Sequence, residues 1–259
     1  MKIAYFDCFS GISGDMTLGA LLDAGLDEGR WRESLRSLNV AGYSVTVERV
    51  VKEGIAAVQV DVVLESPDTE HGRHLRDIEE IIARSQLPAR ASNNAVGAFR
   101  RLARAEARIH GVTVDEIHFH EVGAVDAIVD ICGACIALDL LDIERVYCSA
   151  LPLNRGWVEC AHGTMPVPAP ATLELMAGFA MRPDARVKEL TTPTGAALMA
   201  HLAERSASGV VLPAPPMTLE RTGYGAGRRN SWIPNLLRVM IGELLETDGR
   251  EPAGTRSVG

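Results

Sequence analysis

Aromatic residues are scarce in this 259-residue chain, at 5%, and there are only five cysteines. An odd number of scattered cysteines does not suit a disulfide framework, so we expect buried thiols in a reducing compartment. Hydrophobic residues make up 47% of the chain and charged residues 23%. This is the composition of a globular protein, and it excludes a disordered, collagen-like or low-complexity chain.

The sequence also lacks an excess of basic residues, because 26 Lys and Arg stand against 34 Asp and Glu, for a formal net charge of -8. This argues against nucleic acid as the main partner, since phosphate neutralisation dominates such binding. The longest apolar run, residues 122–141, is interrupted by Asp126, Asp130 and Asp139, which excludes a membrane span. With no signal-peptide pattern at the start, we expect a cytoplasmic protein that binds neither nucleic acid nor membranes.

Short apolar runs alternate with helical patterns, which predicts an α/β fold with a mixed sheet covered by helices. We expect residues 1–245 to form one domain that contains a helical subdomain at 68–115, and residues 246–259 to be a disordered polar tail. The expected strands are residues 3–6, 43–48, 57–64, 116–122, 147–153 and 236–241. The expected helices are residues 16–24, 74–85, 92–110, 123–141, 171–177 and 196–203. Residues 223–227, Gly-Tyr-Gly-Ala-Gly, are expected to form a tight turn or a mobile loop.

Four of the seven histidines fall in two close pairs, His71 with His74 and His118 with His120. Imidazole is the commonest side-chain ligand for metals such as zinc and nickel. The second pair lies in an alternating segment and should share one face, with Glu121 as a nearby oxygen donor. The pattern predicts a metal site, although surface or hydrogen-bonded core histidines would give the same sequence and neither spacing matches a known zinc motif.

Asp126 and Asp130 lie four residues apart, on one face of an otherwise apolar helix. A buried carboxylate needs a partner. In one interpretation, Asp126 interacts with the helix N-terminus and Asp130 with a core arginine or backbone amides. In the other, both orient His118 or His120 through the second ring nitrogen. Asp7 and Asp15, at the end of the first strand, raise the same question.

Three loops could receive anions, at residues 10–15, 191–195 and 223–227. The first two precede helices, whose free backbone N–H groups and positive dipole end attract phosphate or carboxylate. Plain tight turns are the alternative for each loop. The candidate binding residues are Ser10, Gly11, Ser13, Gly14, Asp15, Thr192, Thr194, Gly195, Gly225 and Gly227.

Arginines repeat every four residues along one expected helix face, at Arg100, Arg104 and Arg108, and Arg101 extends this stripe. Such a stripe is typical of a solvated helix face. It could also meet a polyanionic ligand.

Four motifs, in this order, resemble those of the LarC family of nickel insertion proteins, over residues 1 to about 242. They are residues 5–16 (YFDCFSGISGDM), 118–126 (HFHEVGAVD), 192–197 (TPTGAA) and 223–227 (GYGAG). The resemblance implies a nickel chelatase of the lyase class, which inserts nickel into pyridinium-3,5-bisthiocarboxylic acid mononucleotide. Two nickel–sulfur bonds and one nickel–carbon bond form, giving the nickel-pincer nucleotide cofactor of lactate racemase.

The same resemblance implies CTP with a divalent cation as cofactor, and a lactate racemase-type apoenzyme as acceptor of the product. We also expect a homo-oligomer. A base must accept the proton lost from the pyridinium carbon, and we assign this role to His120 or Glu121. The metal ligands that we expect are His71, His74, His118, His120 and Asp126.

Family members commonly continue into a second domain that carries nucleotide binding, whereas this sequence finishes in a small polar tail. The chain is then a separately encoded N-terminal part, a truncated form or a single-domain relative. We expect CTP binding and full activity to need a complementary C-terminal domain, for which a separate polypeptide is the candidate. Two other functions suit the same residues. One is a nickel-binding metallochaperone module without chemistry of its own, and the other is a metal-dependent hydrolase of nucleotides or phosphoesters that activates water.

Overall fold

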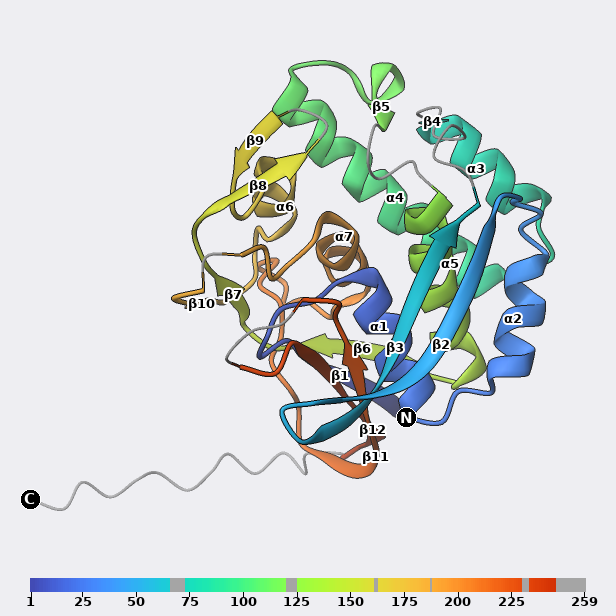
Figure 1. Cartoon of the computed structure of the whole chain (residues 1–259), viewed down its shortest axis with the longest axis vertical. Coiled ribbons are helices and arrows are strands. Elements are labelled where there is room, and N and C mark those ends of the chain that lie inside the picture. The colour runs from blue at the N-terminus through green and yellow to red at the C-terminus, as the bar shows by residue number, and fades with distance from the viewer. Residues whose placement is uncertain (66–72, 120–124, 161–162, 187, 230–232, 246–259) are drawn as a thin grey trace, which may run out of the picture.

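The computed structural model describes residues 1–65, 73–119, 125–160, 163–186, 188–229 and 233–245, with only the backbone of Cys160 (Figure 1). Within these residues it contains seven α-helices and a six-stranded mixed sheet. The α/β class predicted from the sequence is therefore confirmed. None of the helices in this part of the chain combines the length and the apolar character that a membrane span needs.

The central sheet has the strand order β2-β3-β11-β12-β1-β6. Its strands are β1 (Lys2–Asp7), β2 (Tyr43–Lys52), β3 (Ile55–Leu64), β6 (Arg145–Cys148), β11 (Met217–Ala226) and β12 (Leu236–Leu244). Strand β1 lies between β12, to which it is antiparallel, and β6, to which it is parallel. The sheet therefore joins the first described strand to the last.

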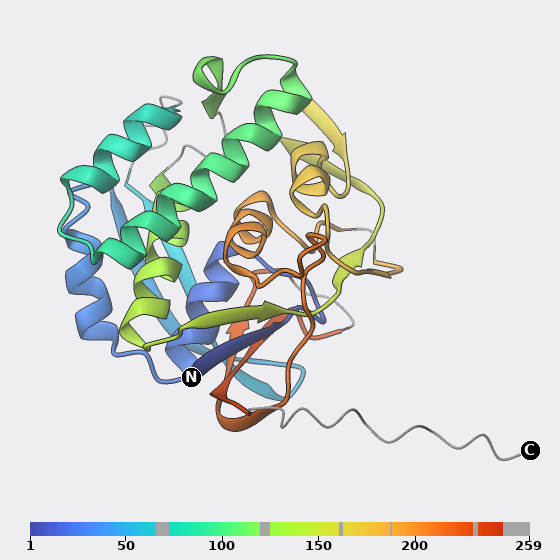
Figure 2. The same ribbon diagram turned by 180° about the vertical axis from the view of Figure 1, so that it is seen from behind.

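Helices cover the sheet and form a second layer above it (Figures 1 and 2). They are α1 (Gly14–Asp23), α2 (Glu28–Arg36), α3 (Leu75–Arg84), α4 (Ala89–His110), α5 (Val125–Leu140), α6 (Pro170–Leu175) and α7 (Pro193–Leu202). Helix α1 packs on β3 and β11, and α5 packs on α1. The region expected as a helical subdomain corresponds to α3 and α4, and α4 packs against α5, α6 and α7 in the main core.

Short two-stranded ladders lie outside the central sheet. They are β4 (Arg73–His74) with β5 (His118–Phe119), β7 (Leu151–Leu153) with β10 (Met181–Pro183), and β8 (Trp157–Cys160) with β9 (Gly163–Pro166). A single 3-10 turn, η2 (Val114–Glu116), precedes β5. The strand expected at 147–153 is thus divided between β6 in the central sheet and β7 in a small one.

The expectation of a loop at residues 223–227 is wrong, because Gly223 and Gly225 lie inside β11. A Cβ atom at Gly225 would overlap the backbone carbonyl oxygen of Met16 in α1. Here glycine lets a helix backbone approach a strand closely, rather than supplying a turn. The buried free thiols expected from the sequence are confirmed for Cys8, Cys132, Cys135 and Cys148.

Candidate functional site

Two helix N-termini are held side by side by a short parallel bridge between Ile12 and Thr191. The Ile12 amide donates to the Leu190 carbonyl at 2.9 Å, and the Thr192 amide donates to the Ile12 carbonyl at 3.0 Å. Helix α1 begins directly after the first segment, and α7 begins directly after the second. The two loops that were predicted from the sequence to bind anions therefore lie side by side.

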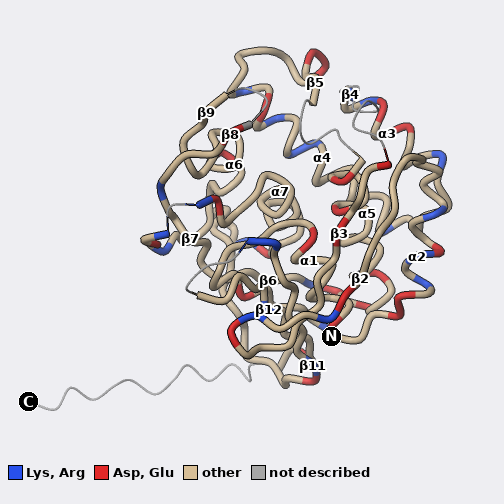
Figure 3. The backbone as a smooth tube through the Cα atoms, viewed as in Figure 1, with Lys and Arg blue, Asp and Glu red and all other residues tan. Residues whose placement is uncertain are grey.

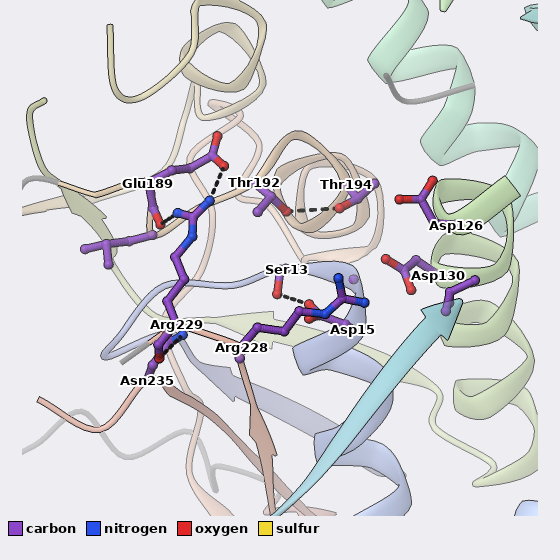
Figure 4. Close-up of a pocket in the computed structure, with 14 residues that line it drawn as sticks. Ser13, Asp15, Asp126, Asp130, Glu189, Thr192, Thr194, Arg228, Arg229 and Asn235 are labelled. Carbon is purple, nitrogen blue, oxygen red and sulfur yellow. Dashed lines mark hydrogen bonds and ion pairs between the residues drawn. The ribbon is translucent and has the colours of Figure 1, made fainter. Parts of the chain in front are cut away.

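These helix ends line a pocket of about 380 Å³ (Figure 4). The residues around it come from β3, α1, α5, α7, the segments that precede α1 and α7, and the segment between β11 and β12. They are Ser13, Gly14, Asp15, Val62, Asp126, Asp130, Glu189, Leu190, Thr192, Thr194, Gly227, Arg228, Arg229 and Asn235. Of the ten anion-binding candidates, six line the pocket: Ser13, Gly14, Asp15, Thr192, Thr194 and Gly227.

Three carboxyl groups, Asp15, Asp126 and Asp130, share this pocket (Figure 4). Desolvation raises the pKa of Asp15 and of Asp126 above the ordinary value. The pKa of Asp130 is raised well above its ordinary value, first by desolvation and then by the negative charges of Asp15 and Asp126. The three groups thus resist simultaneous ionisation, and the cluster is suited to take up a proton or another positive charge.

Asp130 is the most deeply buried of the three carboxyl groups. Its Oδ1 atom is shielded from solvent and has no hydrogen-bond partner. A Cβ atom at Gly14 would overlap the Asp130 side chain, so glycine at this position lets the first turn of α1 approach the carboxyl group. Asp126, by contrast, accepts a hydrogen bond from the Ala127 amide in the first turn of α5, at 2.8 Å. This agrees with the interpretation in which Asp126 interacts with the helix N-terminus.

Two arginines bring positive charge to the same pocket. Arg228 pairs with Asp61 of β3 and extends beside Asp15 (Figure 4), and its charge opposes the rise in the pKa of Asp15 and Asp130. Arg229 pairs with Glu189 at 3.6 Å. The pocket therefore combines a carboxylate cluster with guanidinium groups and two helix N-termini, which suits a ligand that carries both anionic groups and an exchangeable proton.

Ser10 and Gly11, in the segment that precedes α1, do not line the pocket. Ser10 is fully buried, and its hydroxyl accepts a hydrogen bond from Arg186 Nη1 at 2.5 Å. Arg186 also pairs with Asp184 at 2.7 Å, and both side chains are only 4% exposed. Hydrogen bonds from Arg186, and then its charge, lower the pKa of Asp184. Gly11 has a positive φ of 96° and lies against the Leu190 backbone.

Replacing Ser10 by alanine is expected to lower the free energy of unfolding by about 1 to 3 kcal/mol, because a buried guanidinium N–H would lose its acceptor. Chemical denaturation measures this change. Ser208→Ala, at an exposed serine, is the matched control and should stay within about 0.5 kcal/mol of the parent. An equal effect of both substitutions would contradict the anchoring role of Ser10.

Histidines from the two sequence pairs meet on the β4–β5 ladder, where His74 is opposite His118. The rings are edge to face, with centroids 4.7 Å apart. His74 Nδ1 lies 2.8 Å from the Ile117 carbonyl oxygen, so this nitrogen donates and Nε2 carries the lone pair. That Nε2 lies 3.4 Å from His118 Nδ1. Sequence spacing alone could not show that one histidine of each pair lies beside the other.

The other predicted metal and catalytic residues, His71, His120 and Glu121, lie outside the described residues. Within the described part, no group of three or more His, Cys, Asp or Glu side chains is arranged to hold a metal ion. Neither His74 nor His118 lines the pocket, whereas Asp126 does. The described histidines and Asp126 therefore belong to two separate groups of side chains, and the predicted ligand set stays a prediction.

Sequence reasoning missed the pocket residues Glu189, Arg228, Arg229 and Asn235. The two arginines directly follow the last glycine of the fourth motif, and this position was the signal that could have identified them. Two other candidates lie elsewhere. Gly195 packs its Cα against the Ile12 backbone, and Gly225 packs against α1.

The chain is similar in sequence to proteins of one family. The family model described as nickel insertion protein matches residues 4–257. A putative nickel insertion protein of Dictyoglomus thermophilum is 44% identical over 97% of this chain and 63% of its own length. One from Roseiflexus castenholzii is 50% identical over 93% of this chain and 60% of its own.

A third relative, from Desulfitobacterium hafniense strain DCB-2, is named pyridinium-3,5-bisthiocarboxylic acid mononucleotide nickel insertion protein. It is 48% identical over 96% of this chain and 60% of its own length. The chain thus spans less than two thirds of the length of these relatives. No solved structure matches it significantly. With a family match over nearly its whole length and relatives at 44 to 50% identity, the chain belongs to the nickel insertion protein family.

Proposed function

We propose that this chain provides the substrate pocket for nickel insertion into pyridinium-3,5-bisthiocarboxylic acid mononucleotide. The observation that carries the proposal is the convergence of Asp15, Asp126 and Asp130 beside Arg228 and the N-termini of α1 and α7. The name of the Desulfitobacterium relative gives the substrate of that protein. The chemistry of this pocket suits the same molecule.

The substrate has a phosphate and two thiocarboxylates, and it loses a proton when nickel bonds to a ring carbon. Its anionic groups would accept hydrogen bonds from the N-terminal amides of α1 and α7, with Thr192 and Thr194 beside them. Arg228 and Arg229 would neutralise the remaining charge. A single pocket would thus bind the anionic groups and place the ring near the carboxylates.

Asp130 is suited to accept the proton from the ring carbon. As the C–H bond breaks, its electron pair passes to the nickel–carbon bond and the proton passes to the carboxylate. The raised pKa of Asp130 makes its ionised form a stronger base than an exposed carboxylate. His120 and Glu121, the sequence-based candidates for this step, lie outside the described residues.

Nickel, the second substrate, would be held before insertion by His74 and His118. Their facing nitrogens, 3.4 Å apart, offer two imidazole donors to one ion. The other members of the predicted set are His71 and His120, which are their neighbours in sequence, and Asp126 of the pocket. Five residues separate Phe119 from Val125, the first residue of α5. The ladder that carries the two histidines therefore lies at most about 22 Å from the start of the helix that carries Asp126.

The remaining parts of the function are also proposals: CTP with a divalent cation, a separate C-terminal polypeptide, a homo-oligomer and a lactate racemase-type acceptor of the product. The test is reconstitution of this chain with nickel, thiolated nucleotide, CTP and magnesium. It is run with and without the C-terminal part of the Desulfitobacterium relative, and mass spectrometry detects the nickel-pincer nucleotide.

Formation of that nucleotide only when this chain is present would support the proposal. Stoichiometric nickel binding without product would instead indicate a metallochaperone. Phosphate release from a nucleotide without the thiolated substrate would indicate a hydrolase. Either of these results, with the C-terminal part present, would overturn the proposed function.

The double substitution His74→Ala/His118→Ala is expected to weaken nickel binding by at least about tenfold, because two donors are removed from the site. Anaerobic calorimetric titration of the metal-free chain measures this, with zinc and cobalt for comparison. His110→Ala removes a histidine at the end of α4 and should leave the affinity unchanged. Equal affinity in the double variant and the parent would exclude these two histidines as ligands.

A further inference from the structure

A second cleft, of about 440 Å³, lies between α4, α6, α7 and the segment that follows α7. It shares no lining residue with the pocket described above. Its residues are Arg101, Arg104, Ala105, Arg108, Glu174, Leu175, Ala177, Ala200 and Arg205. Four arginines and one glutamate thus line one cleft, in a chain whose formal net charge is -8.

Three of these arginines come from α4, along which basic residues recur (Figure 3). Arg108 pairs with Glu174 of α6, so the one carboxylate of the cleft is already engaged. Arg101 and Arg104 are exposed, and neither forms an ion pair with a carboxylate of the described residues. The cleft therefore has an excess of positive charge that its own walls do not neutralise.

Arg205 is a fixed charge on the opposite wall. Its Nη1 atom donates to the carbonyl oxygens of Gly209 at 2.8 Å and Ala177 at 3.2 Å, and its guanidinium lies 5.3 Å from the centre of the Phe179 ring. Its Nε atom is shielded from solvent without a partner. Its Nη2 atom also donates to the Ala200 carbonyl oxygen at 3.5 Å. These backbone and ring contacts hold the guanidinium in place without cancelling its charge.

Arg101 also acts on its neighbours electrostatically. Burial and then the Arg101 charge lower the pKa of Arg205 and of His201 in α7. Positive groups in this region therefore repel one another, and an anion bound among them would relieve the repulsion.

We propose that this cleft binds a polyphosphate anion, with Arg101 and Arg104 contacting phosphate oxygens and Arg205 facing them from the other wall. Arginine favours phosphate because its planar guanidinium donates two parallel hydrogen bonds. Arg101 and Arg104 are three residues apart, or about 4.5 Å along the helix axis, which suits contacts with neighbouring phosphates of one chain. The inference stands independently of the proposed function.

The shape of the site favours a small ligand over an acidic protein surface. The cleft is concave and lined by nine residues, whereas a stable protein–protein interface buries about 800 Å² on each partner. Clefts of this volume generally bind small molecules.

The test is calorimetric titration of the full chain with tripolyphosphate and pyrophosphate. The parent is expected to bind one tripolyphosphate, and Arg101→Gln/Arg104→Gln is expected to lose at least about tenfold in affinity, because charge-assisted hydrogen bonds are lost. Arg49→Gln/Arg84→Gln removes the same charge at two arginines about four fifths exposed and far from the cleft in sequence. This control is expected to stay within about twofold of the parent.

Two further measurements distinguish the cleft from the pocket. In the parent, tripolyphosphate is expected to shift the ring resonances of His201, and Arg228→Gln is expected to keep the affinity. Absence of saturable binding, an equal loss in both double variants, or a loss confined to Arg228→Gln would each overturn the proposal. Both substituted cleft arginines are exposed, and thermal melting verifies that the double variant is folded.

Discussion

Replacing Asp130 by asparagine is expected to stabilise the protein at neutral pH and to remove most of the proposed activity. Asp130 has a raised pKa because desolvation and two neighbouring carboxylates disfavour its ionised form. The unfolded chain loses this proton near the ordinary value of 3.8, whereas the folded protein keeps it to higher pH. The stability that Asp130 contributes is thus complete below that value and is lost as pH rises through the folded pKa.

Asparagine has the same shape and no charge, so the variant escapes this loss. The gain in unfolding free energy over the parent should be near zero at pH 3.5, rise with pH, and exceed about 1 kcal/mol at pH 8, because an uncompensated buried ion costs several kcal/mol. In the reconstituted reaction, removing the proton acceptor should lower the rate by about 100-fold or more.

Urea denaturation at a series of pH values and the insertion assay measure the two effects. Asp139→Asn is the matched control, since Asp139 is on the same helix α5 but outside the pocket. It should alter neither quantity appreciably. A variant at position 130 that is fully active, or whose stability relative to the parent does not change with pH, would contradict the role given to this carboxyl group.

Gly225→Ala is expected to destabilise the fold by at least about 3 kcal/mol. Its new methyl group would overlap the Met16 carbonyl oxygen and approach the Ala20 amide nitrogen. Overpacking costs about 1 to 3 kcal/mol where side chains can yield, but here both neighbours are helix backbone. For a chain of this size we expect the melting temperature to fall by about 6 to 12 °C.

Gly29→Ala provides the control for Gly225→Ala. Gly29 is exposed in α2 and its nearest neighbour is the end of the Asp27 side chain, at 3.2 Å from the added Cβ. Alanine favours helix over glycine by up to about 1 kcal/mol, so this variant should match or exceed the stability of the parent. Calorimetry of both variants decides, and a stable Gly225→Ala protein would mean that α1 can move off the sheet.

Local patterns in the sequence predicted the elements better than the contacts between them. Apolar runs located β1, the β2–β3 hairpin and β12, and the helical spacing located α4 and α5, because each pattern is set by residues close in sequence. The glycines of β11 gave the wrong prediction of a loop, since glycine equally indicates a turn and a close packing contact. Only the position of α1 against β11 shows that these glycines make a packing contact. That position cannot be predicted from the sequence of β11 alone.

The same limit applies to the candidate site. Asp126 and Asp130 could be placed on one helix face from their spacing, and Asp15 could be placed at a helix N-terminus. Their convergence with Arg228 could not be predicted, because it depends on the bridge between Ile12 and Thr191 and on the order of strands in the sheet. The spacing of residues in the sequence predicts which side chains share a face of one helix or strand. A pocket depends on how several helices and strands pack together.

The pairing of β1 with β12 has a consequence for the time course of synthesis. Lys2 is opposite Glu243, so β1 emerges from the ribosome some 240 residues before the neighbour that completes its ladder. At about 5 to 20 residues per second this delay is roughly 12 to 48 s. During that interval the apolar strand Lys2–Asp7 has an unpaired edge, which makes nascent chains candidates for chaperone binding and makes late-folding β12 the step that closes the sheet.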